Sequence, residues 1–151
     1  MIRSRKPGLD DPMIYRLTRL SLLPYTRRHF PDMKLSRNSV RERLQNGVTL
    51  VKRSGGRFKG FVHFLVRGES LWIDLLAVRK LYRRSGIGEQ LMQKAEDWGR
   101  RKGARQAMLY VNVENEGAKR FYQRRGYRYA HTDRKLHCDL FVKPLVADDP
   151  A

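Results

Sequence analysis

The stretch LLAVRKLYRRSGIGEQLM, residues 75 to 92, joins the end of an apolar segment to the start of a helix through a short turn. Free N–H groups at the start of a helix converge on an anion, and the positive end of the helix dipole attracts it. Gly86 and Gly88 lack the Cβ atoms that would hold a pyrophosphate at a distance. Arg83 and Arg84 add positive charge beside them. The turn therefore predicts a phosphate-binding site.

Two common phosphate loops do not fit this turn. The pattern GxxxxGK[ST] of nucleoside-triphosphate-binding loops does not occur in the sequence. The dinucleotide fingerprint GxGxxG fails because Leu91 stands where the third glycine belongs. Glycine pairs are also common in ordinary turns before helices, so the pattern alone leaves a purely structural role open. A phosphate bound here would belong to another class of ligand.

The segments on either side of the turn are typical of a strand and a long helix. SLWIDLLAV, residues 70–78, is nearly continuously apolar, as expected for a strand covered on both faces. After the turn, apolar residues recur at helical spacing until Gly103, and the basic residues 100–102 lie near the negative end of the helix dipole. The recurring residues are Ile87, Leu91, Met92, Ala95 and Trp98.

Two helices and a hairpin are predicted before this unit. Asp11 followed by Pro12 predicts a helix start, and the first helix is expected to run to about Leu23. Ser39 with Glu42 has the spacing of a capping box and predicts a second, short helix. The next segments, VTLVKR and FKGFVHFLV, surround a serine–glycine–glycine turn and are expected to form a β-hairpin.

The remaining residues complete a mixed sheet. AMLYVNV, residues 107–113, is typical of a strand, and Asn115 is the expected N-cap of a helix that ends at Gly126. Residues 127–131 and 136–142 are expected to pair as a closing hairpin. This order predicts an α/β or α+β fold with a mixed, mostly antiparallel sheet and helices on both faces. The sequence shows no internal repeat or linker, which favours a single domain over residues 1–151.

The composition indicates a globular protein with a strongly basic surface. Of 151 residues, 40% are hydrophobic and 32% charged, and 33 Lys and Arg against 15 Asp and Glu give a net charge of +18. This charge attracts anionic partners without identifying one. The sequence has no membrane-span pattern and no signal-peptide pattern, so we expect a cytoplasmic protein without membrane association. Cys138, the single cysteine, fits a reducing compartment, and no ligand spacing predicts a metal site.

Two motifs in this order resemble the GNAT superfamily of N-acetyltransferases. The family's acyl-CoA-binding signature [QR]xxGx[GA] is met by Arg83, Gly86 and Gly88. A second family signature, an asparagine followed by a helix and a tyrosine just before a glycine–aromatic pair, is matched by NEGAKRFYQRRGY, residues 115–127. Two independent motifs separated by a predicted helix and strand are far more specific than either alone. The order of elements along essentially the whole chain also resembles that fold.

The resemblance implies an acetyl-CoA-dependent N-acetyltransferase. Coenzyme A would place its pyrophosphate on the backbone amides of residues 84–88 and its pantetheine arm along the main chain of Ala77 and Val78. The N–H of Val78 would also stabilise the oxyanion. Asn115 would contact the pantetheine, and Tyr122 would act as general acid toward the leaving thiolate. The implied cofactor-binding residues are Ala77, Val78, Arg83, Arg84, Ser85, Gly86, Ile87, Gly88 and Asn115.

The general base and the acceptor are less well defined. Family members often carry the base at positions matching Trp72 or Asp74, and Trp72 cannot accept a proton. Asp74 is therefore the candidate base, directly or through water, although an ion pair with an arginine explains it equally well. The resemblance implies a primary amine of a small molecule or a protein as acceptor. The residues expected to wall it are Tyr25, Arg27, Arg28, His29, Phe30 and the segment 129–137. It also implies a monomer or a homodimer.

Two other functions stay open. A nucleic-acid-binding module would use the positive charge that coenzyme A, with about four negative charges, does not account for. However, no nucleic-acid-binding motif is visible and the basic residues form no single stripe, so nucleic-acid binding is an alternative and not the prediction. A catalytically silent acyl-CoA sensor would keep the phosphate loop and lack a working base.

Overall fold

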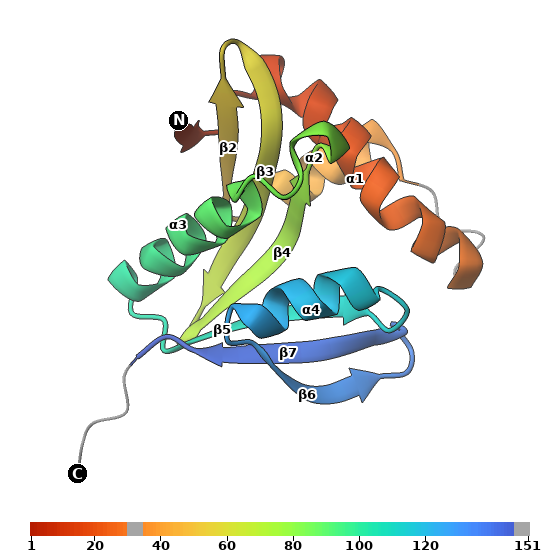
Figure 1. The fold of residues 1–151 in the computed structure, drawn as a ribbon, viewed down its shortest axis with the longest axis vertical. Helices are drawn as coiled ribbons and strands as arrows, with labels where there is room; N and C mark the ends of the chain where they lie inside the picture. The colour runs from red at the N-terminus through yellow and green to blue at the C-terminus, as the bar shows by residue number, and fades with distance from the viewer. Residues whose placement is uncertain (30–34, 147–151) are drawn as a thin grey trace.

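The computed structural model describes residues 1–29 and 35–146, without the side chains at positions 26, 27 and 29. The described residues form four α-helices and a seven-stranded sheet in the order β1-β2-β3-β4-β5-β7-β6 (Figure 1). Neighbouring strands are antiparallel except β4 and β5, which are parallel. The prediction of a mixed, mostly antiparallel sheet is therefore confirmed.

The bounds of the elements follow the sequence patterns closely from residue 48 onward. No helix among the described residues has the length and apolar character of a membrane span. The strands are β1 (Ile2–Ser4), β2 (Val48–Ser54), β3 (Arg57–Arg67), β4 (Ser70–Val78), β5 (Gln106–Asn112), β6 (Arg128–Asp133) and β7 (Cys138–Pro144). The helices are α1 (Pro7–His29), α2 (Arg37–Gln45), α3 (Ile87–Arg101) and α4 (Glu116–Arg124), with a 3₁₀ turn at Lys80–Tyr82.

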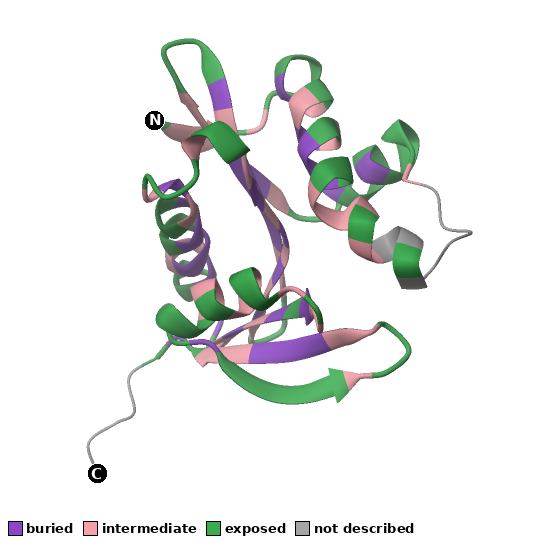
Figure 2. Cartoon of the chain, turned by 45° about the vertical axis from the view of Figure 1, so that its right-hand side comes forward, coloured by how far each residue is buried: buried purple, intermediate pink, exposed green. Residues whose placement is uncertain are grey.

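The sheet separates two hydrophobic cores. α1 and α2 cover one face, and α3 and α4 cover the other (Figure 1). Buried residues concentrate along β3, β4 and the inner side of α3, whereas β6 is exposed along nearly its whole length (Figure 2). β4 contributes to both cores, with Leu71 and Ile73 on the α3 side and Leu75 and Ala77 on the α1 side. This agrees with the expectation that the strand is covered on both faces.

A β-bulge at Asp74 explains how β4 supplies both cores. Across β3, Phe64 lies opposite Ile73 and His63 lies opposite Leu75, so Asp74 is the extra residue. An inserted residue changes which face the following side chains occupy and bends the strand locally. The bulge therefore moves Leu75 from the α3 core to the α1 core.

The first helix begins earlier than the Asp11–Pro12 pattern predicts. α1 starts at Pro7, which occupies the first helical position, and continues past Leu23 to His29. The start is fixed by the Asp10 side chain, whose Oδ2 accepts the Lys6 N–H at 2.7 Å. A carboxylate that reaches back to an amide before the helix performs the capping task, so the predicted start at Asp11 is wrong.

The second helix also has a different cap from the one expected. Ser36 is the N-cap of α2, and its hydroxyl accepts the Ser39 N–H at 3.0 Å. The Ser39 hydroxyl in turn accepts the Ser36 N–H at 3.0 Å, which completes the reciprocal pair. The predicted box of Ser39 with Glu42 is therefore wrong, because Ser39 is the N3 residue of the capping box and Ser36 is its N-cap.

A buried glutamate fastens α3 to the C-terminal part of the sheet. Glu96 accepts hydrogen bonds from the Tyr127 hydroxyl at 2.9 Å, Lys143 Nζ at 2.8 Å and Arg125 Nη2 at 3.2 Å. A fully buried carboxylate needs such partners to offset its lost hydration. The network fixes the end of α4 and β7 against α3.

Replacement of Asp10 by asparagine is expected to cost about 2 kcal/mol of stability at neutral pH. The buried carboxylate accepts hydrogen bonds from Arg3 at 2.7 and 3.1 Å and from Arg53 at 2.9 Å. Burial acts to raise the pKa of Asp10, but the bonds from Arg3, the Lys6 amide and Arg53 hold the pKa below its ordinary value. Its stabilisation is therefore complete above the ordinary aspartate pKa and is lost as the pH falls through the lowered value.

Urea unfolding of the wild type and of Asp10→Asn at neutral and strongly acidic pH measures this effect. The difference in unfolding free energy between the two proteins should shrink in acid. Asp11→Asn, which removes a more exposed ion pair to Arg5, is the matched control and should cost less. A difference that is the same at both pH values would show that the charge of Asp10 is not what stabilises the fold.

Candidate functional site

The parallel pair β4 and β5 separates after three residue pairs. Their register runs from Ser70 opposite Gln106 to Trp72 opposite Met108 and then stops. Beyond Trp72, β4 bends toward α1 while β5 continues beside β7, so the sheet opens between them (Figure 1). The main-chain groups on the facing edges of the two strands are left for other partners. This opening lies in the middle of the sheet.

The glycine turn stands at the end of β4, at the start of α3. Arg84 and Gly86 have positive φ angles of 65° and 80°. The first helical bond runs from the Gln90 N–H to the Gly86 carbonyl at 3.0 Å, so the N–H groups of the three residues between them have no acceptor within the helix. A Cβ on Gly86 would meet no atom within 4 Å. The turn thus presents free amides to open space, as an anion site requires.

The side chains of the turn have separate roles. The Ser85 hydroxyl donates a hydrogen bond to the Tyr82 carbonyl, and Arg83 Nε donates to the Val78 carbonyl at 3.3 Å. The Ile87 side chain is buried in the α3 core and anchors the turn. A Cβ on Gly88 would lie 3.2 Å from the Phe121 ring. Glycine at position 88 therefore leaves room for the Phe121 ring of α4. The sequence pattern had instead attributed it to the approach of a ligand.

The orientation of the β4 main chain changes one expectation. The Arg79 N–H donates to a β3 carbonyl at 2.8 Å, so Ala77, two residues earlier, also directs its groups toward β3. A Cβ on Gly60 of β3 would lie 2.8 Å from the Ala77 carbonyl oxygen, which agrees. The groups that face the opening are therefore those of Leu76 and Val78. Ala77 does not offer the main-chain contacts to a pantetheine arm that were expected of it.

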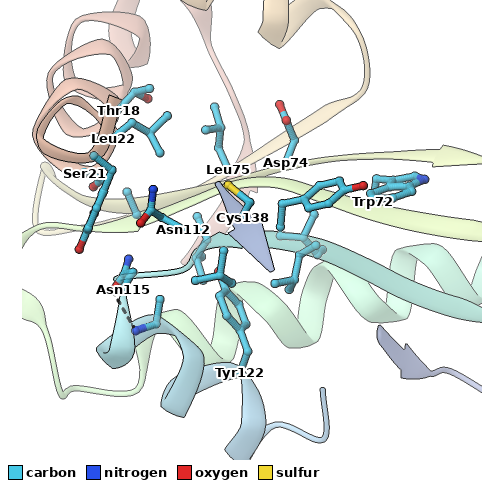
Figure 3. Close-up of a pocket in the computed structure, with 18 of the residues that line it drawn as sticks. Thr18, Ser21, Leu22, Trp72, Asp74, Leu75, Asn112, Asn115, Tyr122 and Cys138 are labelled. Atoms are coloured by element: carbon cyan, nitrogen blue, oxygen red, sulfur yellow. Dashed lines mark hydrogen bonds between the residues drawn. The ribbon is translucent and has the colours of Figure 1, made fainter. Parts of the chain in front are cut away.

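The second motif places two side chains at the same opening. Asn115 is the N-cap of α4, and its Oδ1 accepts the Ala118 N–H at 3.2 Å. Tyr122 projects from α4 toward the gap between β4 and β5 (Figure 3). Its ring packs against Phe121 and Tyr127 with centroids 5.1 and 5.7 Å apart. Burial raises the pKa of the Tyr122 phenol, which therefore stays protonated at neutral pH.

A cavity of about 580 Å³ lies at the opening between β4 and β5 (Figure 3). Its walls come from α1, Arg43 of α2, β3, β4, β5, α4 and the start of β7. It brings Asp74, Asn115 and Tyr122 together and excludes the glycine turn, which lies beyond the end of β4. Among the described residues, no three His, Cys, Asp or Glu side chains lie together as metal ligands would.

Asp74 points into the cavity and is held by an arginine. Its two oxygens accept hydrogen bonds from Arg43 Nε at 2.8 Å and Nη2 at 2.7 Å. His63 Nε2 lies 3.8 Å from Asp74 but bonds to the Asn46 carbonyl at 2.9 Å. Burial lowers the pKa of His63, and its Nδ1 is 2.8 Å from the Thr49 hydroxyl. His63 is thus a neutral, packed histidine.

Some cavity residues carried no signal in the sequence. Arg43 lies 31 positions before Asp74, and nothing in its own segment relates the two. Cys138 lines the cavity and donates its thiol to the Leu136 carbonyl at 3.3 Å; burial raises its pKa. Of the expected acceptor wall, Arg28 forms an ion pair with Glu114. Phe30 and the side chains of residues 27 and 29 lie outside the described residues.

Comparison with known proteins identifies the family. The family model described as "Acetyltransferase (GNAT) family" matches residues 13–127. The chain belongs to this family. The N-alpha-acetyltransferase 30 of Schizosaccharomyces pombe is 40% identical over 63 residues, which cover 40% of this chain and 42% of that protein. The similarity thus spans less than half the length of this relative.

Solved structures share the GNAT fold. The ribosomal-protein-S18-alanine N-acetyltransferase of Escherichia coli aligns with a TM-score of 0.73 at 17% identity, over 99% of this chain and 96% of that one. The PaiA N-acetyltransferase of Thermoplasma acidophilum, in complex with coenzyme A, aligns with a TM-score of 0.71 at 20% identity, over 95% and 99% of the two chains. At these identities the likeness concerns the fold.

Proposed function

We propose that the chain transfers an acetyl group from acetyl-CoA to a primary amine by direct attack in a ternary complex. The observation that carries this proposal is the opening between β4 and β5. The free amides of the glycine turn lie at one end of this opening. Asp74 and Tyr122 both line the cavity at the opening. The match of residues 13–127 to the GNAT family supports the same activity.

The residues present suit coenzyme A. The turn at residues 84–88 offers unpaired amides and open space over Gly86 for the pyrophosphate. Leu76 and Val78 offer main-chain groups along the open edge of β4 to the amides of the pantetheine arm. Asn115 lines the cavity at the start of α4. Arg83 and Arg84 are exposed at the turn and add positive charge.

Each catalytic task has a candidate group. The thioester of acetyl-CoA supplies an activated acetyl group. Asp74 accepts a proton from the acceptor's ammonium, directly or through water, so that the neutral nitrogen can attack the carbonyl carbon. The Val78 N–H stabilises the negative charge that develops on the carbonyl oxygen. As the C–N bond forms and the C–S bond breaks, the Tyr122 hydroxyl gives its proton to the sulfur. The second proton lost by the nitrogen then restores the phenol, so the products are the amide and the free thiol of coenzyme A.

Replacement of Asp74 by asparagine is expected to lower kcat about tenfold, with little change in the affinity for acetyl-CoA. The loss is smaller than the roughly 10²–10⁴-fold that is usual for general base catalysis, because both oxygens of Asp74 already accept hydrogen bonds from Arg43. Arg43→Gln removes the same ion pair but keeps the carboxylate, so it should retain most of the activity. Equal losses in both variants, measured by steady-state kinetics, would assign Asp74 a purely structural role.

Acetyl transfer itself is tested with radiolabelled acetyl-CoA and a cytosolic extract. Incorporation of label into proteins or small amines, above that of a Gly86→Val control, supports the proposal. With a purified acceptor, initial velocities at varied concentrations of both substrates should give intersecting lines, as a ternary complex requires. Parallel lines would indicate an acetylated enzyme and overturn direct attack. Binding of acetyl-CoA without any transfer would favour a silent sensor.

A further inference from the structure

The residues that line the cavity divide between the two faces of the sheet. Tyr122 packs against the hydrophobic core on the α3 side, as does Ile87 at the glycine turn. Asp74 lies on the other side of the strands, where it binds Arg43 of α2 (Figure 3). The proposed pantetheine arm therefore reaches the opening from the α3 side. An acceptor must approach from the side of α1 and α2, which is called the acceptor side below.

Two stacked aromatic side chains lie beside Asp74 on the acceptor side. The sequence neighbours of Trp72 on β4 and of Tyr110 on β5 all pack into the core on the α3 side. Because side chains alternate along a strand, Trp72 and Tyr110 project to the acceptor side. Their rings stack with centroids 5.8 Å apart at an interplanar angle of 20°. Trp72 precedes Asp74 by two residues, or roughly 7 Å at strand spacing, so one small molecule can contact both.

The stack of Trp72 and Tyr110 is part of a larger apolar surface that is open to the cavity. Tyr110 is 42% exposed and Trp72 is half-buried, and both line the cavity. Apolar side chains from α1, β3 and the turn before β7 line it as well, namely Leu22, Leu65 and Leu136. Leu136 is itself 46% exposed. Exposed apolar surface that gathers in one cavity is typical of a pocket for a largely apolar ligand.

The charges of the cavity favour an acceptor with a single ammonium group. Among the described residues that line it, three are charged, and these are Arg43, Arg67 and Asp74. Asp74 binds Arg43 with both oxygens. A second ammonium group would therefore meet two arginines and, among these residues, no further carboxylate. The part of the acceptor that lies away from its amine is thus expected to be apolar and not cationic.

We propose that the acceptor is a 2-arylethylamine group, in which two carbon atoms join the primary amine to a flat aromatic ring, and that Trp72 and Tyr110 bind the ring. This rests on the proposed N-acetyltransferase activity and names the substrate class of the same site. The amine lies by Asp74 while the ring contacts the aromatic stack. An aromatic ring gains more from this surface than a saturated ring of similar size, because aromatic pairs add favourable edge and offset contacts. Trp72 and Tyr110 determine specificity and take no part in the proton transfers.

Four amines test the substrate class with the wild-type protein. They are 2-phenylethylamine, 2-cyclohexylethylamine, ethylamine and spermidine, compared by kcat/KM with acetyl-CoA. The phenyl compound should exceed ethylamine by at least about a hundredfold, because even one methylene group in an apolar pocket changes kcat/KM by about tenfold or more. It should exceed the cyclohexyl compound by about fivefold through its aromatic contacts. Equal efficiency with the two ring compounds would overturn recognition by the aromatic stack.

Spermidine separates failure of this inference from failure of the proposed function. It should be a poorer acceptor than 2-phenylethylamine, since the cavity has no carboxylate among its described residues for the further ammonium groups. A preference for spermidine would overturn the acceptor class while leaving N-acetyl transfer intact. Bound acetyl-CoA without turnover of any amine would overturn the proposed function as well.

Variants of the stack test the two residues directly. Trp72→Leu and Tyr110→Leu keep an apolar side chain, so each should bring the preference for the phenyl over the cyclohexyl compound close to one. The matched control is Trp98→Leu, because Trp98 is also half-buried and packs against the ring of Phe64 outside the cavity. It should keep the wild-type preference. An unchanged preference in both folded stack variants, or an equal loss in Trp98→Leu, would overturn the role of the stack.

Two peptides identify the source of the 2-arylethylamine group, which occurs in free amines and in a phenylalanine at the amino terminus of a peptide. The peptides have the same length and differ in their first residue, phenylalanine or alanine. Higher kcat/KM with the phenylalanine peptide than with 2-phenylethylamine would support a protein amino terminus as acceptor, and the reverse order would support a small amine. Equal acetylation of both peptides, with 2-phenylethylamine inert, would overturn the proposal.

Discussion

Replacement of Gly86 by valine is expected to weaken acetyl-CoA binding at least about a hundredfold. Gly86 has a φ of 80°, a conformation that a β-branched residue adopts only at a cost. Its Cβ would project into the open space beside the free amides of the turn, where the pyrophosphate is proposed to lie. Two charge-assisted hydrogen bonds of about 1.5–3 kcal/mol each account for a loss of this size. Isothermal titration calorimetry with acetyl-CoA measures it.

The control for backbone strain is Gly56→Val. Gly56 has a φ of 74° in the turn between β2 and β3, and a Cβ there also meets no atom within 4 Å. The two variants should therefore lose similar stability, while only Gly86→Val loses affinity. Unchanged acetyl-CoA affinity in folded Gly86→Val protein would remove the proposed phosphate site from this turn. Equal losses of affinity in both variants would attribute the effect to general destabilisation.

Local patterns in the sequence predicted most of the fold. The hairpin of β2 and β3, the apolar β4, the long α3 and the helix capped by Asn115 all lie where turn residues and periodicity placed them. The errors fall before residue 48: β1 was not predicted, α1 both starts earlier and ends later than expected, and α2 has a different cap. The start of α1 is set by Asp10, whose side chain also forms ion pairs with Arg3 of β1 and Arg53 of β2. Such tertiary contacts leave no local signal.

The candidate site was less predictable because its geometry depends on the bulge at Asp74. An extra residue in β4 decides which side chains enter the cavity, and no composition or spacing in SLWIDLLAV indicates it. Register information was also missing when the main chain of Ala77 was expected to contact the pantetheine arm. In the structure, the main-chain groups of Ala77 face β3. The pairing of Asp74 with Arg43 joins β4 to α2 and was likewise invisible. The two sequence motifs indicated the glycine turn, together with Asn115 and Tyr122 of the second motif.

Replacement of Tyr122 by phenylalanine is expected to lower kcat about a hundredfold and leave acetyl-CoA affinity nearly unchanged. The substitution removes only the hydroxyl, because the ring contacts with Phe121 and Tyr127 do not require it. The loss falls within the usual effect of a general acid on proton transfer. Steady-state kinetics with a saturating acceptor, alongside calorimetric titration of acetyl-CoA, separates the two quantities.

The matched control is Tyr127→Phe, which removes a neighbouring hydroxyl that bonds to Glu96 and lies outside the cavity. It should lower stability and leave kcat close to that of the wild type. Because burial raises the pKa of Tyr122, its hydroxyl stays protonated through the range in which the protein is assayed, and the wild type should show no alkaline loss of activity from this group. Activity of Tyr122→Phe equal to that of the wild type would mean that the leaving thiolate takes its proton from water, and Tyr122 would then act through packing alone.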